Sequence, residues 1–296
     1  MSSVMNSIPA PPWMVCPHLS RFSLGWRMGY GEGVIDIFCQ WLDKLNKQQR
    51  AEVQELFPEP FTWQGWWNEE EDDGDDDSFN IMEHGDLLVF VRQPDGQPCY
   101  SRQWLMDQKA GMCRSAVMFW GHQPQADGKL SHSCMSQWWK EDFKREHESF
   151  SCAEQFMMAS KASLFSDSEC KKKIMSSSDP RHIKQLGRTI SPFDESVWDR
   201  FKYAVVVEGN WYKFSCSQRL RDYLIGTGSR VLVEASPADR IWGTGLARDH
   251  EHACNPELWR GENLLGFALM EVRDELRRVY ANAHRCSMEP YRILEE

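Results

Sequence analysis

The sequence lacks the features that mark a secreted, membrane-bound or metal-binding protein. It has ten cysteines, but no two form a C-x-x-C pair, and no Cys/His set has the spacing of a zinc site. The N-terminus has no charged segment followed by an apolar one, and no apolar stretch reaches the roughly 18 residues of a membrane-spanning helix. We therefore expect a cytoplasmic protein with free thiols, without metal, cofactor or membrane partner.

The chain also lacks an excess of positive charge, since 34 Lys and Arg stand against 44 Asp and Glu, for a net charge of −10. Eight of the negative charges fall in the run 69–77, and the remainder is nearly neutral. No overall basic field can draw in nucleic acid, so a nucleic-acid substrate would have to be held locally. The run repels itself, which predicts a solvated loop; an acidic surface for a basic partner is the alternative.

What is present suits a globular protein of 296 residues, long enough for two domains. Apolar residues make up 41% of the chain, and it has 14 tryptophans. Most of these rings are expected in a core, although such rings also line pockets for flat ligands such as nucleobases.

The first part of the chain reads as a loose tail over residues 1–20 and a small mixed α/β domain over 21–115. We find no chemistry in this domain. Its predicted elements are helices over 34–42 and 47–57, the acidic loop over 69–77, a strand over 87–91 and a turn at 94–96.

From residue 117 the pattern becomes mainly helical, with few strands, which predicts an α+β fold. The expected strands are 117–120 and 230–235, and the expected helices are 151–164, 183–186 starting at Asp179-Pro180, 195–207, 220–225 and 264–280.

Two residues of the helix over 151–164 could share one chemical task. Glu154 and Lys161 are seven apart, so they lie on one helix face about 10 Å apart, with Met158 between them. A carboxylate can stabilise the positive charge that develops when a ribose C1–N bond breaks, or activate water. A lysine that loses its proton can attack C1 and open the ring to a Schiff base. The alternative is a capping box between Ser151 and Glu154, with Lys161 an ordinary surface lysine.

Further candidates are individually weaker. Ser136, Gln137 and Trp138 offer donors beside an aromatic ring, which suits a base or a sugar, or a packed turn. The helix start at Asp179-Pro180 could bind phosphate with help from Lys184 or Arg188, or be a plain cap. A loop after the second strand holds Asp239, Trp242 and Gly243, and Asn263 could cap the last helix or bind a ligand.

Taken in order, these segments resemble the NADAR family, also called YbiA-like, over about 160 residues. The matching residues are Phe119-Trp120-Gly121, Ser136-Gln137-Trp138, Ala153-Glu154-Gln155-Phe156-Met157-Met158, Lys161-Ala162, Asp179-Pro180, Lys184, Leu186-Gly187-Arg188, Trp198, Gly209-Asn210, Lys213-Phe214, Leu220-Arg221, Glu234-Ala235-Ser236-Pro237, Asp239, Ile241-Trp242-Gly243, Gly245, Asn255-Pro256, Trp259, Gly261, Asn263-Leu264 and Gly266.

The resemblance implies a compact, mainly helical α+β domain over 117–285 that hydrolyses N-glycosidic bonds. On the family pattern, Lys161 forms the Schiff base, Glu154 assists proton transfer and Asp239 orients the ribose. The pocket would be lined by Ser136, Gln137, Trp138, Asp239, Trp242, Gly243 and Asn263. We also expect Met158, Lys184 and Arg188 to bind the substrate.

Two family activities define the expected substrates. One removes ADP-ribose from guanine bases, as antidote to DNA-modifying toxins, and the other splits riboflavin-pathway intermediates. We expect the first, with an ADP-ribosylated nucleobase or modified DNA as substrate. The alternatives are the riboflavin substrates, and a non-catalytic module that binds ADP-ribose or NAD or neutralises a toxin partner.

Overall fold

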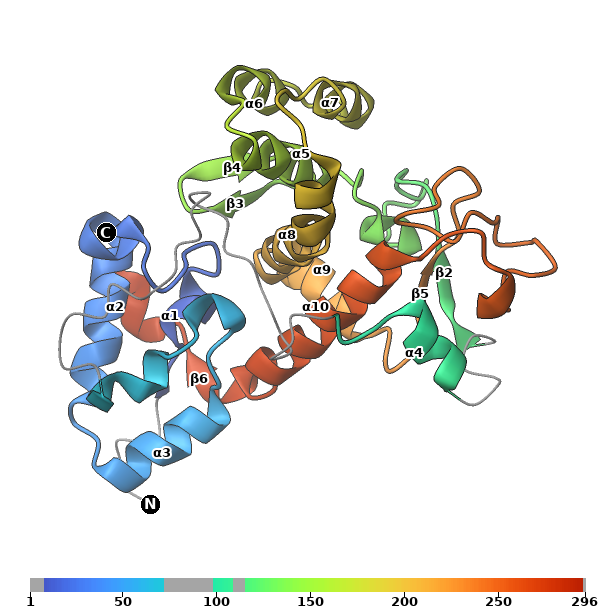
Figure 1. Ribbon diagram of the computed structural model, residues 1–296. Helices are drawn as coiled ribbons and strands as arrows, with labels where there is room; N and C mark the ends of the chain where they lie inside the picture. Colours follow the sequence, from blue (N-terminus) through green and yellow to red (C-terminus); the bar gives the residue numbers. More distant parts are fainter. Residues whose placement is uncertain (1–7, 72–97, 109–114, 295–296) are drawn as a thin grey trace. The chain divides into compact units, whose positions relative to one another are not determined.

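The computed structural model describes residues 8–71, 98–108 and 115–294 (Figure 1). The chain divides into a smaller unit, residues 1–79, 144–148 and 275–296, and a larger unit, residues 80–143 and 149–274. This division differs from the boundary expected near 115–117 in three ways. Residues 144–148 and the C-terminal residues 275–296 belong to the smaller unit, and residues 98–108 belong to the larger one. The predicted strand over 87–91, the turn at 94–96 and most of the acidic run lie outside the described residues.

The smaller unit is built from short elements around an aromatic core. Strand β1 pairs in parallel with β6, and the rings of Trp13 and Trp63 lie 5.3 Å apart at their centroids. The elements are β1 (Ile8–Pro9), α1 (Pro12–Val15), η2 (Leu24–Arg27), α2 (Gly29–Leu42), α3 (Lys47–Leu56), η3 (Phe61–Trp63), η4 (Trp66–Glu71), η8 (Ala283–Arg285), β6 (Cys286–Ser287) and η9 (Glu289–Leu294). The predicted helices over 34–42 and 47–57 are confirmed by α2 and α3.

The expectation of a loose tail does not hold for residues 8–20. Ile8, Trp13 and Leu19 are buried, and Tyr291 donates a hydrogen bond to the Ala10 carbonyl at 2.6 Å. This segment is anchored by a few large buried side chains that lie among prolines. Their spacing is neither helical nor alternating, so the hydrophobic periodicity did not predict an ordered segment.

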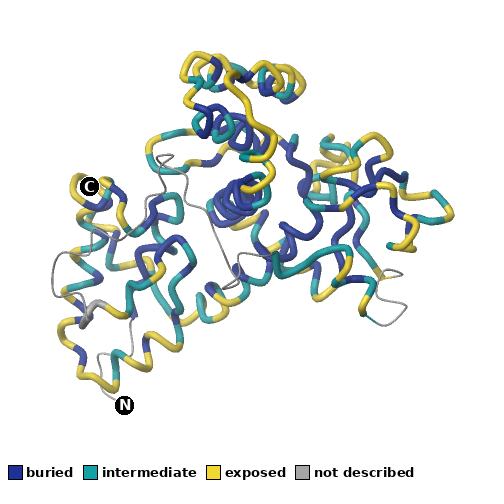
Figure 2. The backbone as a smooth tube through the Cα atoms, viewed as in Figure 1, coloured by how far each residue is buried: buried dark blue, intermediate teal, exposed yellow. Residues whose placement is uncertain are grey.

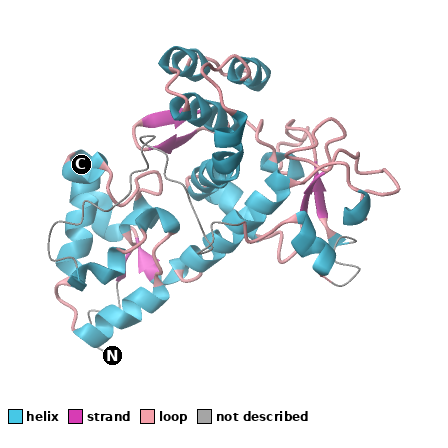
Figure 3. Ribbon diagram, in the orientation of Figure 1, coloured by secondary structure: helices cyan, strands magenta, loops and turns pink. Residues whose placement is uncertain are grey.

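The larger unit is mainly helical, as predicted (Figure 3). Helix α5 packs against α6, α7 and α8, and β2 pairs in parallel with β5. The elements are α4 (Arg102–Asp107), β2 (Val117–Phe119), η6 (His132–Met135), β3 (Phe143–Arg145), β4 (Glu148–Phe150), α5 (Ala153–Leu164), α6 (Ser168–Met175), α7 (Pro180–Gly187), α8 (Glu195–Ser215), α9 (Gln218–Ile225), β5 (Leu232–Glu234), η7 (Pro256–Leu258) and α10 (Leu264–Tyr280). Of these, β3, β4 and α10 extend into residues 144–148 and 275–280, which belong to the smaller unit. Across the described ranges, no helix combines the length and apolar character needed to cross a bilayer.

The core of the larger unit lies along α5 and α8, which are mostly buried (Figure 2). Two features fix the elements around it. Asp179 accepts a hydrogen bond from the Arg181 N–H and precedes Pro180, so α7 begins where the sequence predicts. In the β2–β5 pair, Phe119 lies opposite Glu234, which brings the end of β5 next to the end of β2. The loop after β5 starts from this point.

Gly266 allows α10 to approach β5 closely. A Cβ at this position would lie 2.2 Å from the Leu232 carbonyl oxygen and 2.5 Å from the Asn263 amide. Alanine in place of an interior helical glycine gains about 1 kcal/mol of helix propensity, but overpacking against backbone costs about 1–3 kcal/mol. The close approach to backbone places the cost at the upper end, so we expect Gly266→Ala to lower the free energy of unfolding by up to about 2 kcal/mol in urea titrations. Gly226→Ala, whose Cβ would meet no atom closer than 3.1 Å, should cost less.

Candidate active site

Three carboxyl groups and one lysine of the larger unit act on one another electrostatically. Glu154 begins α5, Glu234 ends β5, and Asp239 lies in the loop that follows. Lys184 on α7 lies with its Nζ 3.9 Å from Asp239 Oδ2. The charge of Lys184 and that of Asp239 act on both glutamates, so four elements of the chain meet at one charged cluster. We call these four residues the carboxylate cluster.

Glu154 is the most buried member of the cluster, with 2% of its surface exposed. Its Oε1 is shielded from solvent and has no hydrogen-bond partner among the described residues. Burial raises the pKa of Glu154 to about 7, while the Lys184 charge and a hydrogen bond from Trp138 act to lower it. A carboxyl group with this pKa can give or take a proton at neutral pH.

Glu234 is a second carboxyl group of the same kind. Burial, and then the negative charge of Asp239, raise its pKa to about 8. Its Oε2 is buried and unbonded within the described part of the chain. Asn263 fixes this residue, because its amide accepts a hydrogen bond from the Glu234 N–H at 2.8 Å and donates one to the Leu232 carbonyl at 3.0 Å. Two glutamates with raised pKa values thus face one region.

Glu234 belongs to the residues that resemble the NADAR family, but its place in the sequence predicts no chemical role for it. At the end of a strand and before a Ser-Pro turn, a glutamate is ordinarily exposed. Its register opposite Phe119 and the burial of its carboxyl group appear only in the structure.

Asp239 is held by the loop it belongs to. Its Oδ1 accepts hydrogen bonds from the Ile241 and Trp242 N–H groups at 3.0 and 2.8 Å, which leaves Oδ2 facing Lys184. Gly243 is needed here, because a Cβ would lie 2.9 Å from the Glu234 carbonyl oxygen. The loop therefore sets the position of Asp239 relative to Glu234.

The capping-box alternative for Glu154 is wrong. The side chain that reaches back to Ser151 is that of Gln155, whose Oε1 accepts from the Ser151 N–H at 2.7 Å. The residue at the helix N-cap is Cys152, and the Glu154 N–H donates to the Gln137 carbonyl at 2.9 Å. The Glu154 carboxyl group is thus left for the carboxylate cluster.

Lys161 lies apart from these contacts. Its Nζ donates to the Gly187 carbonyl at 3.0 Å and lies 4.1 Å from the centre of the Phe193 ring and 5.6 Å from that of Trp198. Burial lowers the pKa of Lys161. In the described residues, the Lys161 amine forms neither a hydrogen bond nor an ion pair with Glu154 or Asp239. The expected meeting of Lys161 with Glu154 therefore stays a prediction.

The remaining predicted residues surround the cluster in supporting positions. The Trp138 ring lies 5.9 Å from Lys184 Nζ, and the charge of Arg188 acts on Glu154. Ser136 and Gln137 are buried: the Ser136 hydroxyl accepts from the Trp138 N–H, and the Gln137 amide accepts from Asn210. The Ser136 hydroxyl thus helps to position Trp138, and direct contact of Ser136 and Gln137 with substrate stays a prediction.

Met158 and Asn263 are also buried. Met158 packs against Gly187, where a Cβ would lie 2.0 Å from its sulfur, so it joins α5 to α7. Both polar groups of the Asn263 amide are used by β5. The geometry gives these two residues a positioning role, and direct substrate contact by them stays a prediction.

The site lies inside the region that a family model matches. The model of the NADAR domain covers residues 118–277, more than half of the chain. The chain belongs to the NADAR domain family.

Two relatives illustrate the similarity. N-glycosidase R617 of Acanthamoeba polyphaga mimivirus is 43% identical over 145 residues, which are 47% of this chain and 85% of the relative. Protein irg-1 of Caenorhabditis elegans is 37% identical over 129 residues, 43% of this chain and 61% of the relative. The expected enzyme class, a hydrolase of N-glycosyl bonds, agrees with the name of the first.

One solved structure is also similar. The NMR structure of the Escherichia coli protein YbiA covers 55% of this chain and 88% of its own, at 26% identity and a TM-score of 0.42.

Proposed function

We propose that the larger unit is an N-glycosidase that hydrolyses the bond between a ribose C1 and a base nitrogen. The observation that carries this proposal is the Glu154 carboxyl group, almost wholly buried, partly unbonded and with a pKa of about 7. A structural glutamate would gain stability from a partner or from solvent. One kept close to half-ionised at neutral pH is suited to proton transfer.

The carboxylate cluster supplies both kinds of proton transfer that the reaction needs. As the C1–N bond breaks, the departing base nitrogen takes a proton. Glu234, with the higher pKa, is the donor, and Glu154 accepts a proton from the attacking group. Asp239, fixed by two backbone N–H groups, stabilises the positive charge that develops on the sugar.

Lys161 is the proposed nucleophile. Its amine attacks C1, gives one proton to Glu154 and the second to the ring oxygen as the ring opens, and is left as an imine with the sugar. Water then hydrolyses the imine and restores the amine. Burial lowers the pKa of Lys161, which favours the free amine. The side chain must first leave the Gly187 carbonyl and turn toward the carboxylate cluster.

The proposed substrate is an ADP-ribosylated guanine, free or in DNA. Lys184 and Arg188 place two positive charges beside Glu154, which suits the two phosphates of ADP-ribose. The Trp138 indole ring offers an aromatic edge for the base or the sugar. Intermediates of riboflavin synthesis share the ribose C1–N bond but have a single phosphate, and they are the second substrate to test.

The substrate test compares the two molecules directly. The protein is incubated with DNA that is ADP-ribosylated on guanine and, separately, with a ribosylaminouracil phosphate. We expect release of ADP-ribose from the first, and little release of ribose 5-phosphate from the second. The reverse result would move the activity to the riboflavin substrates, and no release from either would contradict the N-glycosidase proposal.

The pH dependence of kcat/KM tests the roles of the two glutamates. Activity should need Glu154 ionised and Glu234 protonated, which gives a narrow bell with limbs near pH 7 and pH 8. Glu234→Gln cannot lose a proton, so the falling limb should disappear while the maximal rate drops. A falling limb that persists in this variant would assign it to another group.

A further inference from the structure

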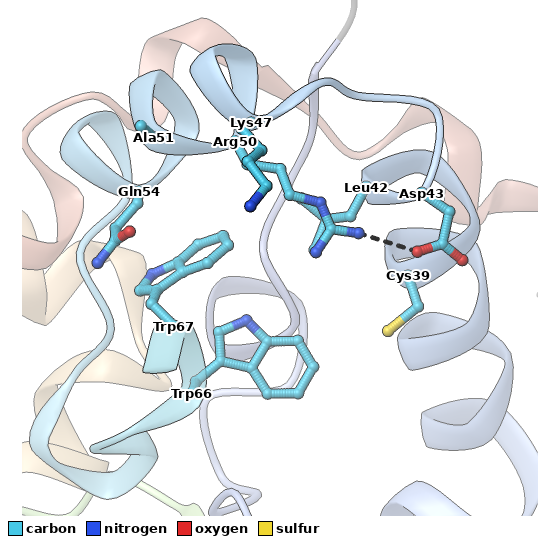
Figure 4. A pocket seen from close by; sticks show the side chains of 9 residues that line it. All are labelled: Cys39, Leu42, Asp43, Lys47, Arg50, Ala51, Gln54, Trp66 and Trp67. Carbon is cyan, nitrogen blue, oxygen red and sulfur yellow. Dashed lines mark hydrogen bonds and ion pairs between the residues drawn. The ribbon is translucent and has the colours of Figure 1, made fainter. Parts of the chain in front are cut away.

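The smaller unit contains a pocket that lies outside the NADAR match. It has a volume of about 300 Å³ and lies between the end of α2, one face of α3 and the start of η4 (Figure 4). It is lined by Cys39, Leu42, Asp43, Lys47, Arg50, Ala51, Gln54, Trp66 and Trp67. A volume of this size is at the lower end of small-molecule sites, enough for one flat ring system and its substituents.

Two indole rings form one wall, and other side chains hold them in place. The Trp67 indole N–H donates to the Phe57 carbonyl at 3.2 Å, and its ring meets that of Trp13 edge to face at 5.9 Å. The Trp66 ring meets that of Trp63 edge to face at 5.3 Å. Rings fixed in this way lose little conformational entropy when a flat ligand stacks on them.

The opposite wall is cationic. Lys47, Arg50 and Gln54 follow at spacings of three and four, so they share one face of α3, and the amine and guanidinium face the indole rings (Figure 4). Asp43 is bonded to Arg50 at 3.0 Å and orients its guanidinium. Within the described ranges Lys47 has no ion pair, so the wall keeps an excess positive charge in a chain of net charge −10.

Stacking faces opposite an amine and a guanidinium fit a flat base that carries a phosphate. Stacking on an aromatic side chain contributes about 1–3 kcal/mol per base, and each base has a suitable face. Arg50 and Lys47 can bind phosphate oxygens, and the Gln54 amide can both donate to and accept from a base edge. An aliphatic acid would leave the indole faces unused, and an uncharged ring would leave the cations unused.

We propose that this pocket binds a nucleotide group, with the base on the Trp66 face and the phosphate at Lys47 and Arg50. The site is separate from the carboxylate cluster and does not depend on the N-glycosidase proposal. The group can come from a free mononucleotide or from a single-stranded nucleic acid that also carries the substrate.

The test uses the full chain and two probes: guanosine 5′-monophosphate by calorimetry, and a fluorescein-labelled single-stranded DNA of about ten nucleotides by anisotropy. Losing a charge-assisted hydrogen bond weakens binding about tenfold or more, and we expect this of Lys47→Glu. Lys44→Glu makes the same charge change on an exposed residue outside the pocket and should bind like the wild type. Trp66→Leu, checked for its melting temperature, removes the stacking face and should also weaken binding.

The two probes distinguish the sources of the nucleotide. Binding of both, weakened by Lys47→Glu, supports a mononucleotide site, and binding of the DNA alone supports a nucleic-acid site. If neither probe binds, or if Lys47→Glu and Lys44→Glu bind equally, the proposal is overturned. Hydrolysis of free ADP-ribosylated guanine by Lys47→Glu should match the wild type, so failure of the nucleotide-pocket proposal leaves the N-glycosidase proposal intact.

Discussion

Glu154→Gln should lower kcat/KM for N-glycoside hydrolysis by about 10²–10⁴-fold, the range expected when a positioned acid or base is removed. The amide has the shape of the carboxyl group but takes up no proton at neutral pH. The Trp138 indole can still donate to the amide oxygen, so the site should keep its geometry. The measurement is the steady-state rate on the substrate that the wild type hydrolyses best.

The same variant should be more stable than the wild type at alkaline pH. The pKa of Glu154 in the folded protein is about 7, above the value of 4.5 for an exposed glutamate. The folded state therefore binds more protons between these values, and its stability falls as pH rises through this window. At about 1.4 kcal/mol per pKa unit, the loss reaches about 3 kcal/mol above pH 7. Glutamine does not ionise, so Glu154→Gln should keep this stability.

Lost activity together with gained stability separates a catalytic carboxyl group from a structural one. Glu169→Gln is the matched control, because Glu169 is exposed on the neighbouring helix α6 and forms a surface ion pair with Lys172. It should change activity and stability little. A Glu154→Gln protein with activity within a few-fold of the wild type would contradict the proposed role.

The helices of the larger unit could be predicted well where apolar residues recur at helical spacing. The prediction for 195–207 ended too early, because α8 continues to Ser215 through buried polar residues. Lys213 is among them: it is fully buried, and its amine donates to the Cys134 and Ser136 carbonyls at 2.7 and 2.8 Å. These hydrogen bonds to residues far away in the sequence offset the cost of burying a charged side chain. The local spacing of apolar residues does not reveal them.

Helix α6 was missed for a related reason. Its sequence, SECKKKIM, buries only Cys170 and Ile174, and the Asp167 cap that starts it resembles any turn. The prediction was less complete for the smaller unit, because it did not assign residues 275–296 to this unit; most of them follow the NADAR match in the chain. The assignment of the C-terminal residues to the smaller unit depends on tertiary contacts, such as the hydrogen bond from the Tyr291 hydroxyl to the Ala10 carbonyl. The spacing of residues along the chain does not predict such contacts.

The sequence predicted the types of residue in the candidate site, but not which charged side chains lie close to one another. Spacing along one helix placed Glu154 and Lys161 on a common face, and the resemblance gave both a role. In the structure Glu154 shares its surroundings with Glu234, Asp239 and Lys184, which come from three other elements. Which charged side chains meet depends on how α5, α7 and β5 pack, and this is a property of the fold rather than of any one segment.

Trapping the proposed imine shows whether Lys161 or Lys184 is the nucleophile. With substrate and borohydride, the wild type should form a stable adduct with the mass of the reduced sugar, attached at Lys161. Lys161→Arg keeps a cation beside Phe193 and Trp198 but forms no imine. We expect it to lose the adduct and to lose activity by roughly 10³-fold or more.

Lys184→Arg is the control that makes this result specific, because it changes the lysine of the carboxylate cluster and keeps its charge. It should still form the adduct, with a raised KM if Lys184 binds the substrate phosphates. If the adduct instead survives in Lys161→Arg and disappears in Lys184→Arg, the nucleophile is Lys184 rather than Lys161. An active wild type that yields no adduct would mean that water, activated by Glu154, attacks C1 directly.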